Sequence, residues 1–507
     1  MTLQSIQTTA SPLPSWERGR GEGAHATTAA PSPQPSPARG EGVRRPRLAL
    51  LTLALVLAGC ASPPAIDANA LPTTPPAWKA EAPTEGRWSV VAPADTQPRG
   101  EWWRAFADPV LDDLEQRAMA RNDDLQVAAS RLAEARALLR NADAARLPQV
   151  GAGAGVSRGT LVTGSPVISN LGQAGLNASY EVDLVGRLSL ASRAALFDVQ
   201  SRVALLESTR LMVQADVAQA YLALRFADLE RHLVRDTVAA YRETLALTQR
   251  RFDAGDVAEL DLVRLQGEVA ATEADALAQD RRRALLENAL AVLLGEPASG
   301  FVLAEADGLA PVPAVPAGLP SDVLARRPDV AAAQRTLMAA QARVGVAQAA
   351  WLPSLSLTGA GGVASPELGD VFRWSARAWS VGALLSLPLF DGGRRQAGIE
   401  AARAQLDGAL ADYRRQVLQS LREVEDQLVS LQGLQREATV QAQAVQAAVR
   451  ATTLSETRWR NGRTSQLDLL DARRSELRNR RAALQVQAGQ YQATVGLVRA
   501  LGGGWVS

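Results

Sequence analysis

The sequence contains few of the residues that build reactive or cross-linked sites. Its 507 residues include one cysteine, Cys60, and two histidines, His25 and His232. A single cysteine excludes an intramolecular disulfide framework, and two isolated histidines cannot supply a metal cluster or a histidine-based catalytic triad. A glycine-rich phosphate loop followed by lysine is also missing from the sequence. We therefore expect a protein that is not an enzyme and that needs neither a metal ion nor a cofactor.

A net charge of one sign is lacking as well. The 54 lysines and arginines nearly balance the 53 aspartates and glutamates, which leaves a formal charge of +1. Without a global electrostatic field, the composition gives no support to nucleic acid as a partner.

The lone cysteine follows a segment with the features of an export signal. Arg44, Arg45 and Arg47 precede an apolar run over residues 48–57, which leads into Leu-Ala-Gly-Cys60. The run is too short for a spanning helix and has the length of a cleaved signal core. This pattern resembles a bacterial lipoprotein signal, so we predict a signal peptide at 44–59 and lipidation of Cys60. A buried cysteine after a chance hydrophobic stretch is the alternative.

Proline-rich stretches divide the rest of the chain. Residues 1–43 are of low complexity, and we interpret them as a leader outside the fold, with Val43 as an alternative start of translation. We expect residues 60–100 to run extended from the lipid anchor to the body of the protein. The stretch 296–320 contains Pro311, Pro313 and Pro316, and it is predicted to be a linker because proline cannot continue a helix.

The two sides of this linker carry the same landmarks. The motif RFDAG at 251–255 returns as RWRNG at 458–462, an offset of 458 − 251 = 207, and RLP at 146–148 returns as WLP at 351–353, an offset of 353 − 148 = 205. Several landmarks in one order indicate duplication. We predict a first repeat at 101–295 and a second at 321–507.

Each repeat contains two segments with period-two patterning. The pattern covers residues 150–157 and 176–184 in the first repeat, and residues 354–358 and 379–389 in the second. Runs of about ten residues with one apolar face fit tilted strands of a membrane β-barrel. Periodicity alone favours a half-buried soluble sheet instead, and that reading stays open here.

Very long helices are predicted after each pair of strands. Residues 186–252 contain no proline, and about 66 helical residues would extend roughly 100 Å. In the second repeat, apolar residues from Leu406 to Leu431 step by threes and fours, which is an amphipathic helical seam. The segments 257–294 and 466–501 are predicted to return as helices that cover these seams.

Four candidate strands cannot close a barrel without leaving unpaired edges in lipid, so a membrane sheet would require several chains.

Several motifs along the chain resemble those of a known family. The motifs WWRAFADP at 102–109, RRPDV at 326–330, FDGGR at 390–394 and the two Arg-x-x-x-Gly tips resemble the TolC-like outer membrane factors, in particular the lipoprotein branch that serves drug efflux. The resemblance covers about residues 60–505.

The resemblance implies a mostly α-helical homotrimer with membrane β-structure. Three chains would close a twelve-stranded β-barrel in the outer membrane, continued by an α-helical barrel through the periplasm. The implied function is a passive exit duct for drugs or other small toxic compounds. The implied partners are outer-membrane lipid, a periplasmic adaptor protein and an inner-membrane transporter of the resistance-nodulation-division class. A type I protein-secretion channel of the same fold is the alternative, whereas duplication argues against a periplasmic adaptor.

The resemblance also assigns roles to particular residues. It implies that Arg251, Gly255, Arg458 and Gly462, at the two helix reversals, contact the adaptor. A plain helix reversal, where glycine adopts a left-handed conformation, is the alternative.

Two carboxylates follow the second reversal. The resemblance implies that Asp468 and Asp471 line a periplasmic gate, where threefold symmetry would make rings of three carboxylates that attract cations. The local alternative is that Ser465 caps the following helix and that Asp468 favours its first turn.

Overall fold

The computed structural model describes residues 64–65, 71–80, 87–88, 100–161, 167–306, 308–313, 315, 320–503 and 505–506. The chain divides into two units, residues 1–56 and 57–507, and every described residue belongs to the second unit. The predicted leader, the signal peptide and Cys60 lie outside the described residues, so the fold concerns the two repeats and the segments that contact them.

The two repeats contain the same elements in the same order. The first contains α2 (Pro109–Arg121), α3 (Asp123–Ala144), β2 (Gln149–Leu161), β3 (Val167–Val182), α4 (Arg187–Asp253) and α5 (Glu259–Leu293). The second contains α6 (Pro320–Arg326), α7 (Pro328–Ala349), β4 (Ser354–Ser365), β5 (Arg377–Ser386), α8 (Arg394–Arg460) and α9 (Gln466–Ala500). The starts of α4 and α8 differ by 394 − 187 = 207, and those of α3 and α7 by 328 − 123 = 205. The helices and strands therefore recur along the chain with the offsets read from the sequence.

Short elements complete the unit. They are β1 (Arg87–Trp88), paired with β6 (Trp505–Val506), and the 3-10 helices η2 (Trp102–Phe106), η3 (Ala298–Gly300), η4 (Leu368–Asp370) and η5 (Trp374–Ala376). None of the described helices combines the length and the apolarity that a membrane-spanning helix requires.

The four longer strands form one antiparallel sheet in the order β2-β3-β4-β5, so each repeat contributes one hairpin. The hairpins join where β3 pairs with β4 from Gly172↔Ser365 to Val182↔Leu355. Glycines allow this approach, because a Cβ added to Gly362 would lie 2.3 Å from the carbonyl oxygen of Ala174. The sheet is thus shared between the repeats rather than belonging to either.

The strands differ in length from the predicted runs of about ten residues. β2, β3 and β4 have 13, 16 and 12 residues, and only β5 has 10. The predicted pattern was also wrong at Leu184, Leu387 and Leu389, which lie beyond the strand ends. Pro388 cannot donate to a strand ladder, and its position two residues after β5 is consistent with the early end of that strand.

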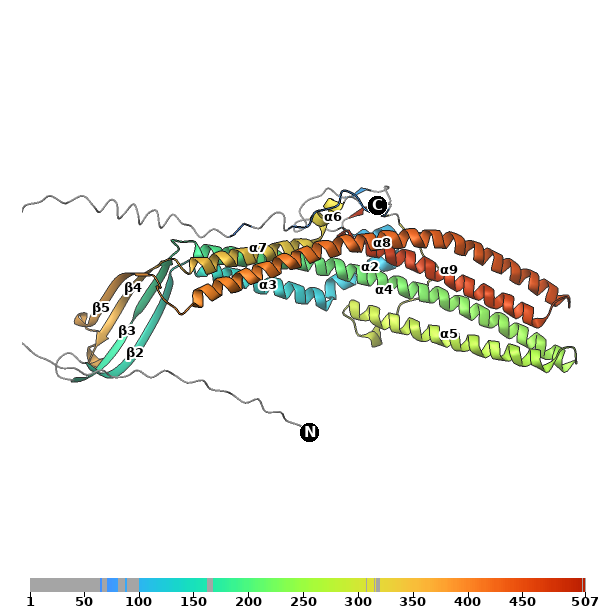
Figure 1. Cartoon of the computed structure of the whole chain (residues 1–507). Helices are drawn as coiled ribbons and strands as arrows, with labels where there is room; N and C mark the ends of the chain where they lie inside the picture. Colours follow the sequence, from blue (N-terminus) through green and yellow to red (C-terminus); the bar gives the residue numbers. More distant parts are fainter. Residues whose placement is uncertain are drawn as a thin grey trace, which may run out of the picture. The chain divides into compact units, whose positions relative to one another are not determined.

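The long helices agree with the sequence prediction. α4 and α8 each have 67 residues, which corresponds to about 100 Å. Both begin after a glycine in the left-handed region, Gly186 with φ 78° and Gly393 with φ 91°. The sheet lies at one end of these helices, and the reversals into α5 and α9 lie at the other (Figure 1).

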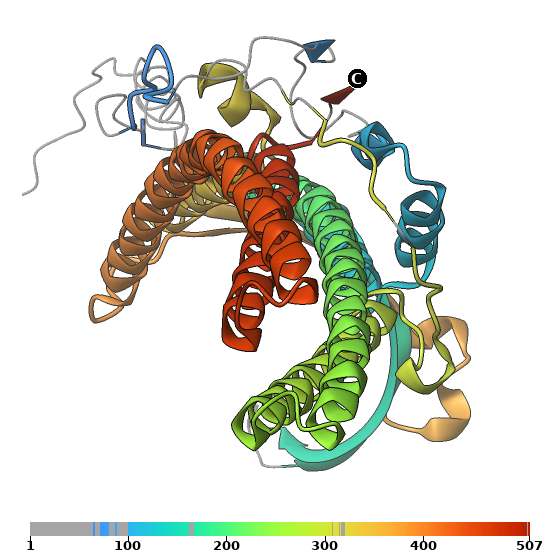
Figure 2. The same ribbon diagram turned by 90° about the vertical axis from the view of Figure 1, so that its right-hand side faces the viewer.

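Viewed along their axes, the helices of this unit form a curved layer (Figure 2). α4 packs against α3, α5, α7 and α9, whereas α8 packs mainly against α7 and α9. Along α8, the buried residues Val417, Val424 and Leu428 belong to the seam predicted from the sequence. α5 and α8 therefore lie on opposite flanks of the layer.

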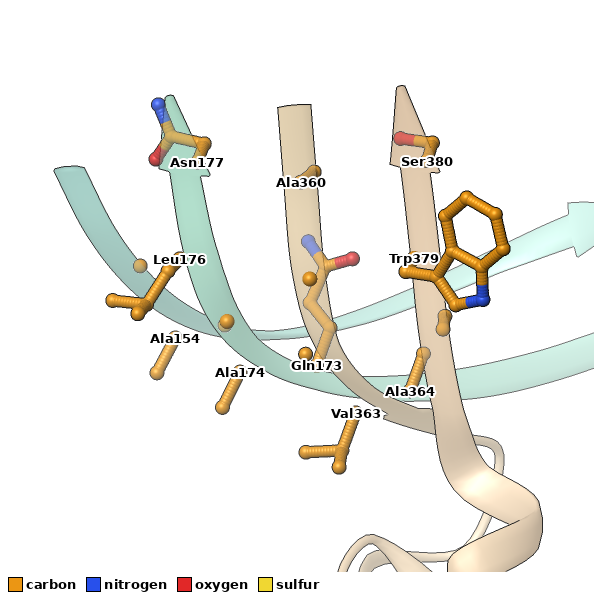
Figure 3. Close-up of a pocket in the computed structure, with 16 residues that line it drawn as sticks. Ala154, Gln173, Ala174, Leu176, Asn177, Ala360, Val363, Ala364, Trp379 and Ser380 are labelled. Atoms are coloured by element: carbon orange, nitrogen blue, oxygen red, sulfur yellow. The ribbon is translucent and has the colours of Figure 1, made fainter. Parts of the chain in front are cut away.

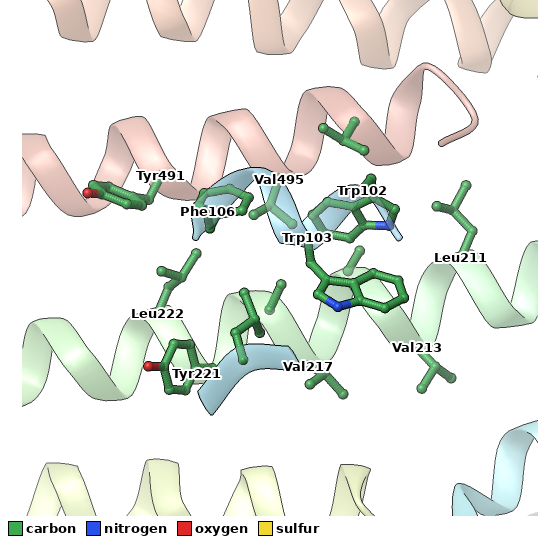
Figure 4. Close-up of a cluster of buried hydrophobic side chains, with 14 of the residues drawn as sticks. Trp102, Trp103, Phe106, Leu211, Val213, Val217, Tyr221, Leu222, Tyr491 and Val495 are labelled. Atoms are coloured by element: carbon green, nitrogen blue, oxygen red, sulfur yellow. The ribbon is translucent and has the colours of Figure 1, made fainter. Parts of the chain in front are cut away.

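The main hydrophobic core lies midway along the long helices, where η2 inserts against α4 and α9 (Figure 4). Trp102 and Phe106 are buried, and the rings of Phe106 and Tyr491 stack with centroids 6.1 Å apart. Buried indole and phenyl rings contribute large apolar areas, so the WWRAF segment stabilises the contact between α4 of the first repeat and α9 of the second.

The described residues of the linker also pack against this core. Phe301 and Val315 are buried in it. Arg283 donates to the carbonyl oxygen of Leu303 at 2.6 Å, and Glu287 accepts from the backbone N–H of Leu303 at 2.7 Å. This part of the linker is thus bound to α5 and is not a free spacer.

Candidate functional site

The sheet presents two chemically different faces. Opposite residues in an antiparallel pair point to the same side, so Leu176, Gly361 and Trp379 share one face, and Asn177, Ala360 and Ser380 share the other. Figure 3 shows Leu176 and Asn177 leaving β3 on opposite sides, beside a shallow depression of about 550 Å³ lined mostly by small residues. The alternation predicted from the sequence is therefore present in the sheet.

The apolar face is exposed in the single chain. Trp379 is 79% exposed and Val381 is 78% exposed, and Leu176 lies open on the same face. An apolar surface of this kind indicates contact with lipid or with another protein. A half-buried soluble sheet would cover this face with helices, but the helices lie beyond the end of the sheet (Figure 1).

The two outer strands each have an unpaired side. β2 pairs only with β3, and β5 pairs only with β4, among the strands that the structure describes. Free N–H and C=O groups along a long strand are a template for another strand. The sheet is consequently open at both edges.

At the far end of the helices, the two reversals have the same backbone geometry. Gly255 and Gly462 have φ values of 82° and 67°, which side chains other than glycine rarely adopt. The amide of Asp256 donates to the carbonyl oxygen of Arg251, and the amide of Arg463 donates to that of Arg458, both at 2.8 Å. These bonds form a Schellman-type helix end at each reversal. The glycines are thus explained locally by the turn.

The predicted arginine side chains differ from each other. Arg458 is exposed, whereas Arg251 lies over the ring of Trp459 with its guanidinium carbon 5.9 Å from the centroid. A guanidinium within about 6 Å of an indole is a cation–π contact. The contact joins the end of α4 to the end of α8, so the two reversals lie side by side.

Asp468 and Asp471 are both exposed near the start of α9. The Asp468 carboxylate accepts from the Ser465 hydroxyl at 2.7 Å and from the Thr464 hydroxyl at 2.7 Å, and the Ser465 side chain accepts from the amide of Asp468. These hydrogen bonds, led by that from Ser465, lower the pKa of Asp468 from its usual value of 3.8. The predicted N-cap is confirmed as a full capping box, and Asp468 is negatively charged at neutral pH.

Asp471 has different surroundings. It lies 3.5 Å from Arg474 and helps to line a depression of about 600 Å³ between α5 and α9. The carboxylates of Glu268 and Asp275 face the same depression. The sequence had not indicated that acids of α5 would lie beside the second reversal.

Arginines of α9 connect the two helical hairpins. Arg474 forms an ion pair with Glu268, and Arg481 forms one with Asp275 at 2.6 Å. The spacing matches on both helices, since 481 − 474 = 7 and 275 − 268 = 7. The sequence contained one indication of these ion pairs, namely the matching seven-residue spacing of acids on α5 and arginines on α9. This spacing predicts ion pairs only if the two helices are already known to be adjacent.

Together these features define a class of protein. Strands that expose an apolar face and two open edges, joined end-on to paired helices of about 100 Å, are the parts of a membrane-embedded channel with a long helical extension.

The chain belongs to the outer membrane efflux protein family, whose pattern matches residues 114–296 and 319–503, one segment in each repeat. It is 33% identical to the pyoverdine export outer membrane protein OpmQ of Pseudomonas aeruginosa over 91% of this chain and 97% of that protein. It is 30% identical to the cation efflux system protein CusC of Escherichia coli over 90% of this chain and 99% of that protein.

Solved structures agree. The outer-membrane channel OprN superposes with a TM-score of 0.79 at 32% identity, over 88% of this chain and all of that one. The Neisseria gonorrhoeae MtrE outer membrane channel gives a TM-score of 0.72 at 29% identity, over 86% of this chain and 98% of that one. The protein is therefore an outer-membrane efflux duct that extends into the periplasm, and its family is one of channels rather than enzymes.

Proposed function

We propose that three copies of this chain form one continuous duct across the outer membrane and the periplasm. The supporting observation is the four-stranded sheet with an exposed apolar face and unpaired edges on β2 and β5. Pairing β5 of one copy with β2 of the next closes 3 × 4 = 12 strands and leaves no edge in lipid.

The helical layer supports the same closure. α8 and α5 lie on opposite flanks and carry exposed apolar side chains, among them Val440 on α8 and Leu277 on α5. A neighbouring copy that covers these side chains turns three curved layers into a tube. The duct is passive, and we assign no catalytic residue to it.

The duct works with a periplasmic adaptor and an inner-membrane pump of the resistance-nodulation-division class. Similar proteins are named for antibiotic, toluene, cation and pyoverdine export. Because one architecture serves such different cargo, the pump selects the substrate, and the substrates here are drugs or other small toxic compounds. A type I protein-secretion channel is the second candidate, since it would use the same duct.

The reversals at the ends of α4 and α8 form the adaptor contact, with Arg251, Gly255, Arg458 and Gly462 as its residues. Exposed backbone at two glycine turns allows close approach of a partner helix. The chain is anchored through lipid on Cys60 after removal of the signal at 44–59. Palmitate labelling of the wild-type chain and its absence in Cys60→Ser tests the anchor.

Asp468 and Asp471 form the periplasmic gate. Their exposed carboxylates lie near the start of α9, at the end of the α8–α9 hairpin that lies opposite the sheet (Figure 1). Three copies would place two rings of negative charge at the entrance, which attract cations and oppose anions. Replacing both residues by alanine should reduce cation selectivity in single-channel recordings, and selectivity equal to that of the wild type would refute the ring.

The function as a whole is tested by complementation. A host that lacks its own outer-membrane channel but retains adaptor and pump should regain tolerance to dyes, detergents and antibiotics when it expresses this chain. Restored protein secretion without restored tolerance would favour the second candidate. A stable monomer in the outer membrane would overturn the trimeric duct.

A further inference from the structure

The two reversals have opposite charge at matched positions. We call residues 253–256 the first tip and residues 460–463 the second tip. The first tip reads Asp-Ala-Gly-Asp and the second reads Arg-Asn-Gly-Arg. The repeat offset aligns Asp253 with Arg460, because 460 − 253 = 207, and Asp256 with Arg463, because 463 − 256 = 207. At both matched positions, the first tip therefore has an acidic residue and the second tip has a basic one.

These charges are displayed on nearly identical backbones. Gly255 and Gly462 both take a left-handed conformation and are followed by the same pattern of backbone hydrogen bonds. All four charged side chains are exposed. Asp253 accepts from Gln249 at 2.9 Å, and Arg460 donates to Glu456 at 2.6 Å, both within one helical turn. Such exposed local contacts are weak and leave the charges available to a partner.

The identical backbones create an ambiguity for any partner. Three copies with two tips each present 3 × 2 = 6 turns in a ring, and the Arg251–Trp459 contact shows that the two kinds of tip are neighbours. A partner that recognises only the shape of the turns could bind in two rotational registers of similar energy. In one register a given partner surface contacts the first tip, and in the other it contacts the second tip. Charge of opposite sign removes this equivalence, because the wrong register places like charges together.

We propose that the opposite charges of the two tips fix the rotational register of the periplasmic partner, which presents basic side chains to the first tip and acidic side chains to the second. This inference rests on the proposed function and adds the chemistry of the partner surface. It separates the roles at the reversal: the glycines set the shape, and the four flanking charges decide which turn a given partner hairpin meets.

The test uses the full-length trimer and the adaptor that supports this channel in the complementation experiment. Asp253→Arg with Asp256→Arg makes both tips basic, and Arg460→Asp with Arg463→Asp makes both acidic. Each variant should lower adaptor affinity by about tenfold or more at low ionic strength, with a smaller loss at high salt. Arg131→Asp with Arg136→Asp, on the exposed surface of α3 away from the tips, changes the net charge by as much as the acidic variant does and should leave affinity unchanged.

The decisive variant exchanges the charges, with all four substitutions in one chain. It should recover affinity to within about threefold of the wild type, because every attraction is restored in the other register. A photo-crosslinking residue placed at Ala254 or at its counterpart Asn461 then reads the register: the adaptor peptides captured at the two positions should trade places. Trimers are first verified by size and thermal stability, and neutral Asp→Asn and Arg→Gln versions at the same positions should lose affinity without charge reversal.

The possible results distinguish failure of this inference from failure of the proposed function. If both single-tip variants bind the adaptor with wild-type affinity at low salt, the charges do not fix the register, and the proposed duct is unaffected. An exchanged variant as weak as the single-tip variants, or an unchanged crosslinking pattern, also overturns it. A wild-type trimer that binds no adaptor at all overturns both proposals.

Discussion

The central helix of the first repeat and its counterpart in the second have the same length and very different surroundings. Of 67 residues each, α4 buries 25 and α8 buries 10 within the chain. α4 is covered by α3, α5, α7 and α9, whereas α8 has neighbours mainly on one side. Duplication of the sequence therefore did not duplicate the environment.

The comparison shows which faces of a duplicated helix carry different side chains. At the centre of the layer, α4 keeps apolar and paired polar groups on several sides, and at the flank α8 keeps one inward seam and an outer face for a neighbouring chain. Matched positions, 207 residues apart, can thus serve as controls for each other, since helix geometry is equal and only burial differs.

The largest effect is expected at the buried ion pairs of the first hairpin. Asp228 is fully buried and pairs with Arg283 at 2.6 Å and Arg225 at 3.3 Å, and its counterpart is the exposed Gln435 (435 − 228 = 207). Asp228→Leu removes the carboxylate that pairs with buried Arg225 and one of the two that pair with Arg283, and it should cost about 3–5 kcal/mol. Gln435→Leu should change stability by less than about 0.5 kcal/mol. Urea unfolding followed by circular dichroism compares the two, and equal losses would contradict the assignment of α4 as the central helix.

A purely apolar pair gives the next largest contrast. Leu222 on α4 is 1% exposed, and its counterpart Val429 on α8 (429 − 222 = 207) is 60% exposed. Leu222→Ala creates a cavity and should destabilise the fold by about 2–5 kcal/mol. Val429→Ala should leave the fold of the chain intact and act only on association of chains. Thermal unfolding measures the first effect and the trimer fraction in detergent measures the second.

Helix capping provides a smaller and reciprocal test. Ser465 caps α9, while Ala258 occupies the same position before α5 without a side-chain hydrogen bond, although both have similar backbone angles. Ser465→Ala should cost about 1 kcal/mol, and Ala258→Ser should stabilise the first turn of α5 by up to about the same amount, since Asp261 can complete a capping box. Amide hydrogen exchange in the first turns of the two helices measures both changes, and protection that moves in one direction only would refute the equivalence.

A further expected change depends on pH. Glu115 on α2 is fully buried, both carboxylate oxygens lack a hydrogen-bond partner among the described residues, and burial, with Asp112 adding to it, raises its pKa well above 4.5. A raised folded-state pKa means that stability is fully present below the unfolded pKa and is lost as pH rises through the folded pKa. Glu115→Gln should remove this loss, so its advantage in melting temperature should grow from about pH 4 to about pH 8. Exposed Glu134→Gln is the control, and parallel pH curves for Glu115→Gln and the wild type would contradict the prediction.

Much of this architecture could be predicted along the chain. The proline-free run and the glycine turn located α4 to within about one residue, and the seam from Leu406 to Leu431 indicated the inward face of α8. The capping box at Ser465 was predictable because it involves neighbours only. The predicted strand ends were less accurate, because glycine-rich segments continue a period-two pattern without a clear apolar signal. In addition, the period-two pattern continues past Pro388, whereas β5 ends two residues before this proline.

Some features of the candidate sites could likewise be predicted from the sequence, and others could not. The reversals at Gly255 and Gly462 follow from local turn geometry, and the sequence located both. The ion pairs that join Arg474 and Arg481 to α5, the packing of Arg251 on Trp459 and the binding of Leu303 to Glu287 and Arg283 were not predictable. Each of these contacts depends on which helices become neighbours, and periodicity does not contain that information.

By itself the sequence determined the order and duplication of the helices and strands and the length of the long helices, because dihedral preferences, capping and amphipathic period act over a few residues. Only the tertiary structure decided that α4 lies inside the layer and α8 at its flank, and that the apolar face of the shared sheet remains uncovered. The physical reason is that burial is a property of neighbours distant in sequence: two nearly equivalent helices became different when the chain placed partners on several sides of one and largely on one side of the other.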